Sequence, residues 1–403
     1  MSIRIQNGPK RFLLLLLIVF IFFLSPQISE ATEATSSTAL PPGKINRDIS
    51  RGIELLYDCE FDHAENLFHG IIAESPKDPV GYFYLAMVTW SRLAYGFWSP
   101  EIVRQYGMRI DRAVSVATER IENEKADSFT YFYLGGALGF KGRFQMMQRK
   151  WLSSFFLARN AVAAFKTCLI MDPNNKDVLL GLGIFDYYTA RLSGVLKFLT
   201  YFLIHEGDKY EGLRKLHAAA NESIYSAVEA KNVLLYIYLF MEPLSNKARP
   251  LAEELAERFK NNARFKFLQG VTYIRLGMDS EYRGVVDFLY ERSHKESSLK
   301  SASLWSNRAF YLEASYYLFH GQYEMARSKL DVILSQTYPT SDPAMVTWPL
   351  LKKGMSYDLG GQREKALAYY RRILKVENGG DAQFLAEKYI KSPVKEKSRF
   401  LGY

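Results

Sequence analysis

The sequence predicts an all-α protein built as a helical solenoid. One pattern of small and aromatic residues returns along the chain with nearly constant spacing. Its two clearest copies contain, in order, Ala314, Tyr317 and Gly321, and then Gly354, Tyr357 and Gly361. Alternating apolar and polar runs bounded by hairpin turns, the pattern of β-strands, do not occur. A helical pair of this kind cannot bury its apolar face alone, so successive pairs must stack.

The N-terminal residues have the pattern of a secretory signal peptide. Basic residues up to Arg11 precede an uninterrupted apolar run at 12–24, and Pro26 and a small-x-small pattern at 29–31 follow. The run is short for a membrane span. We therefore predict a signal peptide over 1–31, with an uncleaved anchor as the alternative. The Ser-, Thr- and Pro-rich residues 32–46 predict a flexible linker.

Charge and cysteine content exclude several classes of protein. The formal net charge of +9 is spread along 403 residues with acids interleaved, which predicts no nucleic-acid partner. Two cysteines, Cys59 and Cys168, are too few for a disulfide framework, and we expect two separate buried thiols. The residues 388–403 are basic and are expected to form a solvated tail.

About eight helical pairs are expected over 47–387. The first helix of each pair carries a small residue at position 8, and the second carries one at position 20, where the two helices must approach closely. In the first unit these are Gly52 and Ala64, with Phe68 at position 24 and Pro76 in the closing turn. The later units are marked by Ala86, Gly135, Gly183, Ala248, Gly270, Ala314 and Gly354.

This pattern resembles the tetratricopeptide repeat family, which implies a right-handed helical solenoid that binds protein or peptide partners. Residues 179–218 include Gly181-Leu182-Gly183, Val195-Leu196-Lys197-Phe198-Leu199, Gly207-Asp208 and Gly212-Leu213. This segment is similar to the tetratricopeptide repeat protein 39 / inclusion-body clearance family, whose members carry a lengthened repeat and are not known as enzymes. The resemblance implies the fold and the inserted helices and transfers no site residue.

The second, third and fourth units are lengthened by aromatic insertions near 94–108, 142–158 and 190–206. Adjacent units place equivalent loops on one edge, so we expect the insertions to form one aromatic and basic cap. Two interpretations stay open. The aromatic side chains can pack inward as core, or they can form a binding or membrane-contacting surface. The basic residues that could frame such a surface are Arg143, Arg149, Lys150, Arg159 and Lys197.

The motifs of catalysis are absent from the sequence. The six histidines are scattered and form no His-Glu-x-x-His motif, and the glycine-rich run at 135–142 lacks the spacing of a phosphate-binding loop. No Gly-x-Ser-x-Gly elbow occurs. We therefore predict a protein that is not an enzyme and has no cofactor and no metal site.

Binding is the function that the sequence favours. In the family that the repeats resemble, positions 5, 9 and 12 of the first helix face a concave groove. An aromatic groove suits an apolar or helical segment of a partner. The candidate groove residues are Phe83, Met87, Trp90, Phe132, Phe140, Tyr187, Tyr188, Phe267, Arg275 and Tyr311.

We expect an exported, periplasmic or secreted scaffold that binds a protein or peptide partner in the cell envelope. The alternative is a membrane-associated protein that binds a membrane surface or lipid through the aromatic and basic insertions.

Overall fold

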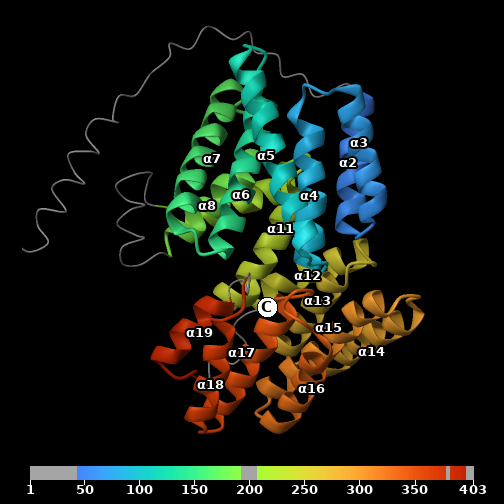
Figure 1. The fold of residues 1–403 in the computed structure, drawn as a ribbon, viewed down its shortest axis with the longest axis vertical. Coiled ribbons are helices and arrows are strands. Elements are labelled where there is room, and N and C mark those ends of the chain that lie inside the picture. Colours follow the sequence, from blue (N-terminus) through green and yellow to red (C-terminus); the bar gives the residue numbers. More distant parts are fainter. Residues whose placement is uncertain (1–42, 192–206, 378–381, 396–403) are drawn as a thin grey trace, which may run out of the picture. The chain divides into compact units, whose positions relative to one another are not determined.

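A computed structural model describes residues 43–191, 207–377 and 382–395, and these residues form helices joined by short turns, without a strand (Figure 1). The prediction of an all-α helical solenoid is confirmed. The proposed signal peptide, the linker residues 32–42, the insertion residues 192–206 and the tail residues 396–403 lie outside the described residues. The first described helix begins at Gly43, before the predicted boundary at 47.

The helices follow one another as pairs in chain order. The first four pairs are α2 (Gly43–Tyr57) with α3 (Phe61–Glu74), α4 (Pro79–Tyr95) with α5 (Pro100–Glu122), α6 (Ser128–Met147) with α7 (Trp151–Met171), and α8 (Val178–Thr189) with α10 (Lys209–Glu222). Next come α11 (Ala227–Tyr236), which continues into a π-helical turn, η1 (Ile237–Met241), and α12 (Ser245–Arg258). The remaining helices are α13 (Ala263–Leu276), α14 (Asp279–Lys295), α15 (Leu299–Phe319), α16 (Tyr323–Gln336), α17 (Ala344–Leu359), α18 (Arg363–Ile373) and α19 (Ala382–Lys391).

Small residues stand where the two helices of a pair touch, as the sequence predicts. A Cβ atom added to Gly52 would lie 2.4 Å from the ring of Phe68, and one added to Gly354 would lie 2.3 Å from the ring of Tyr370. Real Cβ atoms do not approach carbon this closely, because van der Waals contact begins near 3.5 Å. The large residue of the second helix therefore fills the space that the glycine leaves.

The first two insertions mainly lengthen helices, which are joined by short turns at 96–99 and 148–150. Gly96 ends α4 in the left-handed conformation, with a φ of 108°, and Pro100 starts α5, whose N-cap is Ser99. The second insertion supplies the last turns of α6 and the first turns of α7. The two cysteines are free thiols; Cys168 is buried and Cys59 is half-buried.

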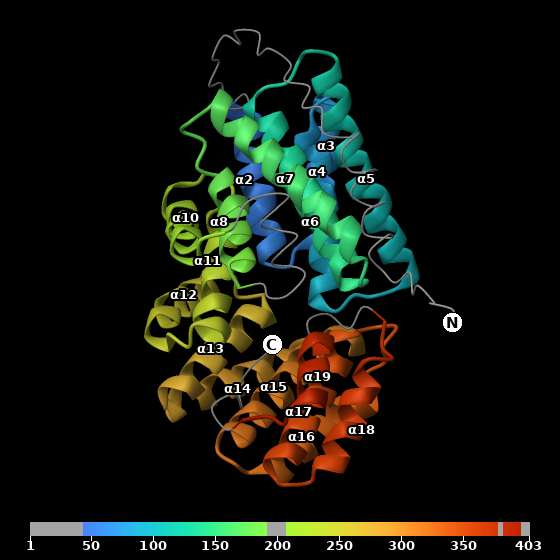
Figure 2. The ribbon, with the colours of Figure 1, turned by 90° about the vertical axis from the view of Figure 1, so that its left-hand side faces the viewer.

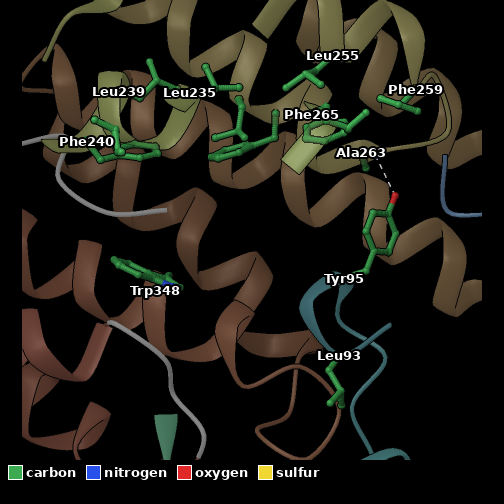
Figure 3. Close-up of a cluster of buried hydrophobic side chains, with 14 of the residues drawn as sticks. Leu93, Tyr95, Leu235, Leu239, Phe240, Leu255, Phe259, Ala263, Phe265 and Trp348 are labelled. Carbon is green, nitrogen blue, oxygen red and sulfur yellow. Dashed lines mark hydrogen bonds between the residues drawn. The ribbon is translucent and has the colours of Figure 1, made fainter. Parts of the chain in front are cut away.

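Helices of the N-terminal pairs form hydrogen bonds with parts of the chain that are more than 150 residues away in the sequence. The hydroxyl of Tyr57 donates to Glu229 at 2.7 Å, and the hydroxyl of Tyr225 donates to Asn46 at 2.7 Å. Figure 3 shows Tyr95, at the end of α4, accepting a hydrogen bond from the amide of Ala263 at 2.9 Å. A linear solenoid contacts only its neighbours, so these contacts between distant pairs are a feature that the repeat pattern does not predict.

Candidate binding surfaces

The ten candidate groove residues are mostly packed inside the described chain. Phe83, Met87, Phe132, Tyr187, Phe267 and Tyr311 are buried. Trp90, Phe140 and Arg275 are half-buried. Tyr188 alone among the ten is exposed, with 39% of its surface open to solvent. Their role in binding a partner stays a prediction.

Aromatic side chains of neighbouring helices fill the space that an open groove would need. The ring centroid of Phe140 lies 6.4 Å from that of Phe83 and 5.7 Å from that of Trp90, so α6 covers the aromatic face of α4. Farther along, the ring centroids of Phe267 on α13 and Tyr311 on α15 are 5.6 Å apart. These distances are typical of aromatic pairs in a core.

Two basic side chains lie in this interior. Burial, together with the nearby charge of Arg275, lowers the pKa of Lys352 to about 7. Burial also lowers the pKa of Arg275 to about 10. The ammonium of Lys352 lies 5.3 Å from the ring centroid of Tyr311, close enough for a cation–π interaction. The interior between α13, α15 and α17 is therefore both aromatic and basic.

Glu242, directly after η1, joins the two ends of the third insertion. Its Oε1 accepts hydrogen bonds from Tyr187 at 2.6 Å and from Arg191 at 2.9 Å, and its Oε2 accepts one from Lys209 at 2.6 Å. Burial opposes ionisation of this carboxyl group, but these donors outweigh it and the pKa of Glu242 is lowered. One carboxylate thus fixes the residues that flank 192–206.

A shallow hollow, which is open to solvent over most of its boundary and has a volume of about 650 Å³, lies over α16 and α17. Its lining consists of Glu324, Arg327, Ser328, Asp331, Val332, Ser335 and Tyr357. The guanidinium of Arg327 lies 4.6 Å from the ring centroid of Tyr357 and donates to Glu324 at 3.0 Å. Asp331 pairs with Lys353. The hollow therefore offers charges of both signs beside an aromatic ring.

The hollow lies mainly on the second helix of a pair, whereas the predicted groove lies on the first helices. Glu324, Arg327 and Asp331 are spaced by three and four residues, which places them on one face of a second helix. That spacing is the signal in the sequence from which the hollow can be found. Tyr357, the tyrosine of the last repeat, is the lining residue that also belongs to the repeat pattern.

Helix α7, the second helix of its pair, exposes large apolar side chains. Leu152, Phe156 and Ile170 are 64%, 38% and 78% exposed. Among the described helices, α7 alone is long and apolar enough to cross a bilayer, and only 28% of its most apolar stretch is buried. By contrast, the described residues contain no cluster of three or more His, Cys, Asp or Glu side chains that could hold a metal ion.

Comparisons with known proteins yield only distant structural likeness. No family model matches the chain, and no curated protein matches it. The human IFIT1 dimer solved with PPP-AAAA is 13% identical, with 91% of each chain covered and a TM-score of 0.43. The tetratricopeptide repeat domain of P58(IPK) is also 13% identical, with 86% of this chain and 89% of that chain covered and a TM-score of 0.23.

Likeness at this level assigns no function to the chain. The similarity of 179–218 to the tetratricopeptide repeat protein 39 family finds no support in the comparisons and stays a prediction.

Proposed function

We propose that this chain is an exported, non-catalytic scaffold that holds a protein or peptide partner in the cell envelope. The hollow over α16 and α17 is the observation that carries the proposal. Stacked helical pairs commonly present extended surfaces to other proteins, and here the hollow is a place where such a surface is open to solvent.

The chemistry of the hollow suits a peptide with both polar and apolar groups. Val332, 37% exposed, supplies an apolar point, while Arg327 and Asp331 supply a donor and an acceptor beside it. The ring of Tyr357 stacks on that of Tyr369 at 5.4 Å, which fixes its orientation. An apolar centre with a polar rim is the usual arrangement of protein interfaces, and fixed tyrosines are common among their strongest contacts.

Export is supported by the order of residues at the N-terminus. A basic start, the apolar run at 12–24 and the small residues at 29–31 follow the order that signal peptidase recognises. Mass spectrometry of the protein recovered from cells should then find a chain that begins after residue 31. A chain that retains residues 1–31 would contradict the predicted cleavage.

Site-specific crosslinking in living cells tests the scaffold function. A photo-crosslinking amino acid at position 332 should capture a defined protein, whereas the same group at Tyr210, which is 76% exposed on α10, should not. Ser328→Arg places a long charged side chain in the hollow from an exposed position and should abolish the capture. The control is Ser50→Arg on α2, which alters another exposed helical serine and should leave capture unchanged.

Two crosslinking results would contradict the proposed scaffold function. If position 332 captures nothing, or if Ser328→Arg and Ser50→Arg give the same crosslinks, the hollow does not hold a partner.

A further inference from the structure

One face of α7 carries a continuous exposed stripe that mixes apolar and basic side chains. Successive members are three or four residues apart, which places them on one side of the helix. The α7 stripe consists of Leu152, Phe156, Arg159, Ala163, Lys166 and Ile170. At about 1.5 Å per residue, the stripe extends over most of a helix that is roughly 30 Å long.

The opposite face of α7 is held in the core. Val162, Phe165 and Cys168 are buried, and the ring of Phe165 lies where Cβ atoms of Gly135 and Gly181 would otherwise stand. Figures 1 and 2 show α7 alongside α6, with which it forms a pair. Since one side of α7 packs on the protein and Arg159 and Lys166 lie in its middle, the helix is suited to lie on a membrane rather than to cross it.

The segment of chain that forms α6 and α7 carries charge of one sign. From Ser128 to Met171 the chain has six basic residues and no acidic residue. Lys141 pairs with Asp111 at 2.7 Å, and Arg149 pairs with Glu387 at 2.5 Å. The exposed side chains of Lys150, Arg159 and Lys166 form no ion pair within the described residues. Three cations are therefore available beside the apolar side chains of the stripe.

We propose that the α7 stripe docks along the surface of a bilayer that contains anionic lipid. The apolar side chains would enter the boundary between headgroups and acyl chains, and the three cations would contact lipid phosphates. A nucleic acid would use the cations but offers no apolar layer to Leu152 or Ile170. The stripe is separate from the hollow over α16, so this inference goes beyond the scaffold function and either can fail alone.

A fluorescent label tests the docking in the full chain. Nitrobenzoxadiazole is attached through Leu152→Cys, or through Met108→Cys on α5, whose native side chain is 67% exposed and serves as the matched control position. Burial raises the pKa of both natural thiols, Cys59 and Cys168, to about 12, so both stay protonated and react slowly at neutral pH. The label reports its own surroundings, so insertion of the apolar run at 12–24 alone does not change it.

On vesicles of phosphatidylglycerol, the label at position 152 should brighten and shift to the blue, and the label at 108 should not change. Phosphatidylcholine vesicles should leave both labels unchanged. The charge reversal Lys150→Glu, Arg159→Glu, Lys166→Glu should lower vesicle partitioning by at least about tenfold, since each basic residue near an anionic surface contributes to binding. The matched triple Lys365→Glu, Arg371→Glu, Lys375→Glu changes net charge equally on and near α18 and should keep the response.

Three results with vesicles would overturn the proposal. They are an unchanged label at 152 on phosphatidylglycerol, an equal response on phosphatidylcholine, and an equal loss in the two charge triples. A change at 152 that grows with protein concentration without vesicles would also overturn it, because a second copy of the chain would then cover the stripe. Each of these outcomes leaves the crosslinking result at position 332 unaffected.

Discussion

The same substitution, glycine to alanine, should have opposite effects at two helical positions of this protein. Gly354 lies within α17, where a Cβ atom would stand 2.3 Å from Cε1 and 2.7 Å from Cδ1 of Tyr370. Gly284 is exposed within α14, and apart from the adjacent backbone of its own helix no atom lies within 4 Å of its Cβ position. The pair separates the intrinsic preference for alanine from the requirement for close helix contact.

Both substitutions gain up to about 1 kcal/mol from helix propensity. Gly284→Ala should keep that gain, whereas Gly354→Ala must displace a fully buried ring. Overpacking of this kind costs about 1–3 kcal/mol. The ring also cannot move freely, since the hydroxyl of Tyr370 donates to the carboxylate of Asp358 at 2.9 Å. Strain on that hydrogen bond adds about 1 kcal/mol to the overpacking cost. Gly354→Ala should therefore still lower the free energy of unfolding by about 1–3 kcal/mol after the propensity gain is subtracted.

Urea unfolding followed by circular dichroism measures both variants. Amide hydrogen exchange in α17 and α18 locates the change, since units of a repeat protein can open separately. The double variant Gly354→Ala, Tyr370→Leu should be less destabilised than the sum of the two single variants, because the smaller side chain makes room for the methyl group. If Gly354→Ala stabilises the protein as Gly284→Ala does, close contact at the small positions is not what holds the pairs together.

Three further perturbations test the interior of the protein. Phe267→Ala should lower the free energy of unfolding by about 3–5 kcal/mol, since its ring is 1% exposed, while Tyr188→Ala should change it little; equal small losses in thermal denaturation would place Phe267 in an open groove instead. Burial lowers the pKa of Lys352 to about 7, so between pH 7 and pH 10.5 the unfolded chain binds more protons than the folded one and the free energy of unfolding rises with pH. In urea titrations, Lys352→Met should reduce this rise between pH 7 and pH 9. An unchanged dependence on pH would contradict the lowered pKa of Lys352. Tyr95→Phe removes the acceptor of the Ala263 amide and should cost about 1–3 kcal/mol; unaltered hydrogen exchange at that amide would show that the bond is not formed.

The fold could be predicted from the sequence because the residues that pair consecutive helices lie close together in the sequence. A small residue in one helix and a large residue in the next helix are separated by only one short connection between helices, as Gly52 and Phe68 are. The structure brings these two residues into contact. The contacts between distant pairs could not be predicted. Tyr57 and Glu229 are 172 residues apart, and their meeting depends on the rise and rotation accumulated over several pairs. The residue pattern of a single repeat does not determine this accumulated rise and rotation.

The site was predictable only in part, since a helical register states which way a side chain points and not what covers it. Tyr187 and Tyr188 are neighbours in the sequence and were assigned to the same groove. The first is fully buried, with its hydroxyl bonded to Glu242, and the second is 39% exposed. The partner of Tyr187 lies 55 residues away, so the sequence around the two tyrosines could not distinguish them.

Aromatic packing between neighbouring pairs also explains where the open surfaces are. Aromatic residues of the first helices are buried by packing within the chain, as Phe83 on α4 and Phe267 on α13 are. Both surfaces proposed here lie mainly on second helices, α7 and α16, whose outer faces no described helix covers. In an open solenoid, aromatic first helices supply the binding groove and second helices form the back. Here the aromatic residues stabilise the fold, so selection for binding can act on the second helices without disturbing the core.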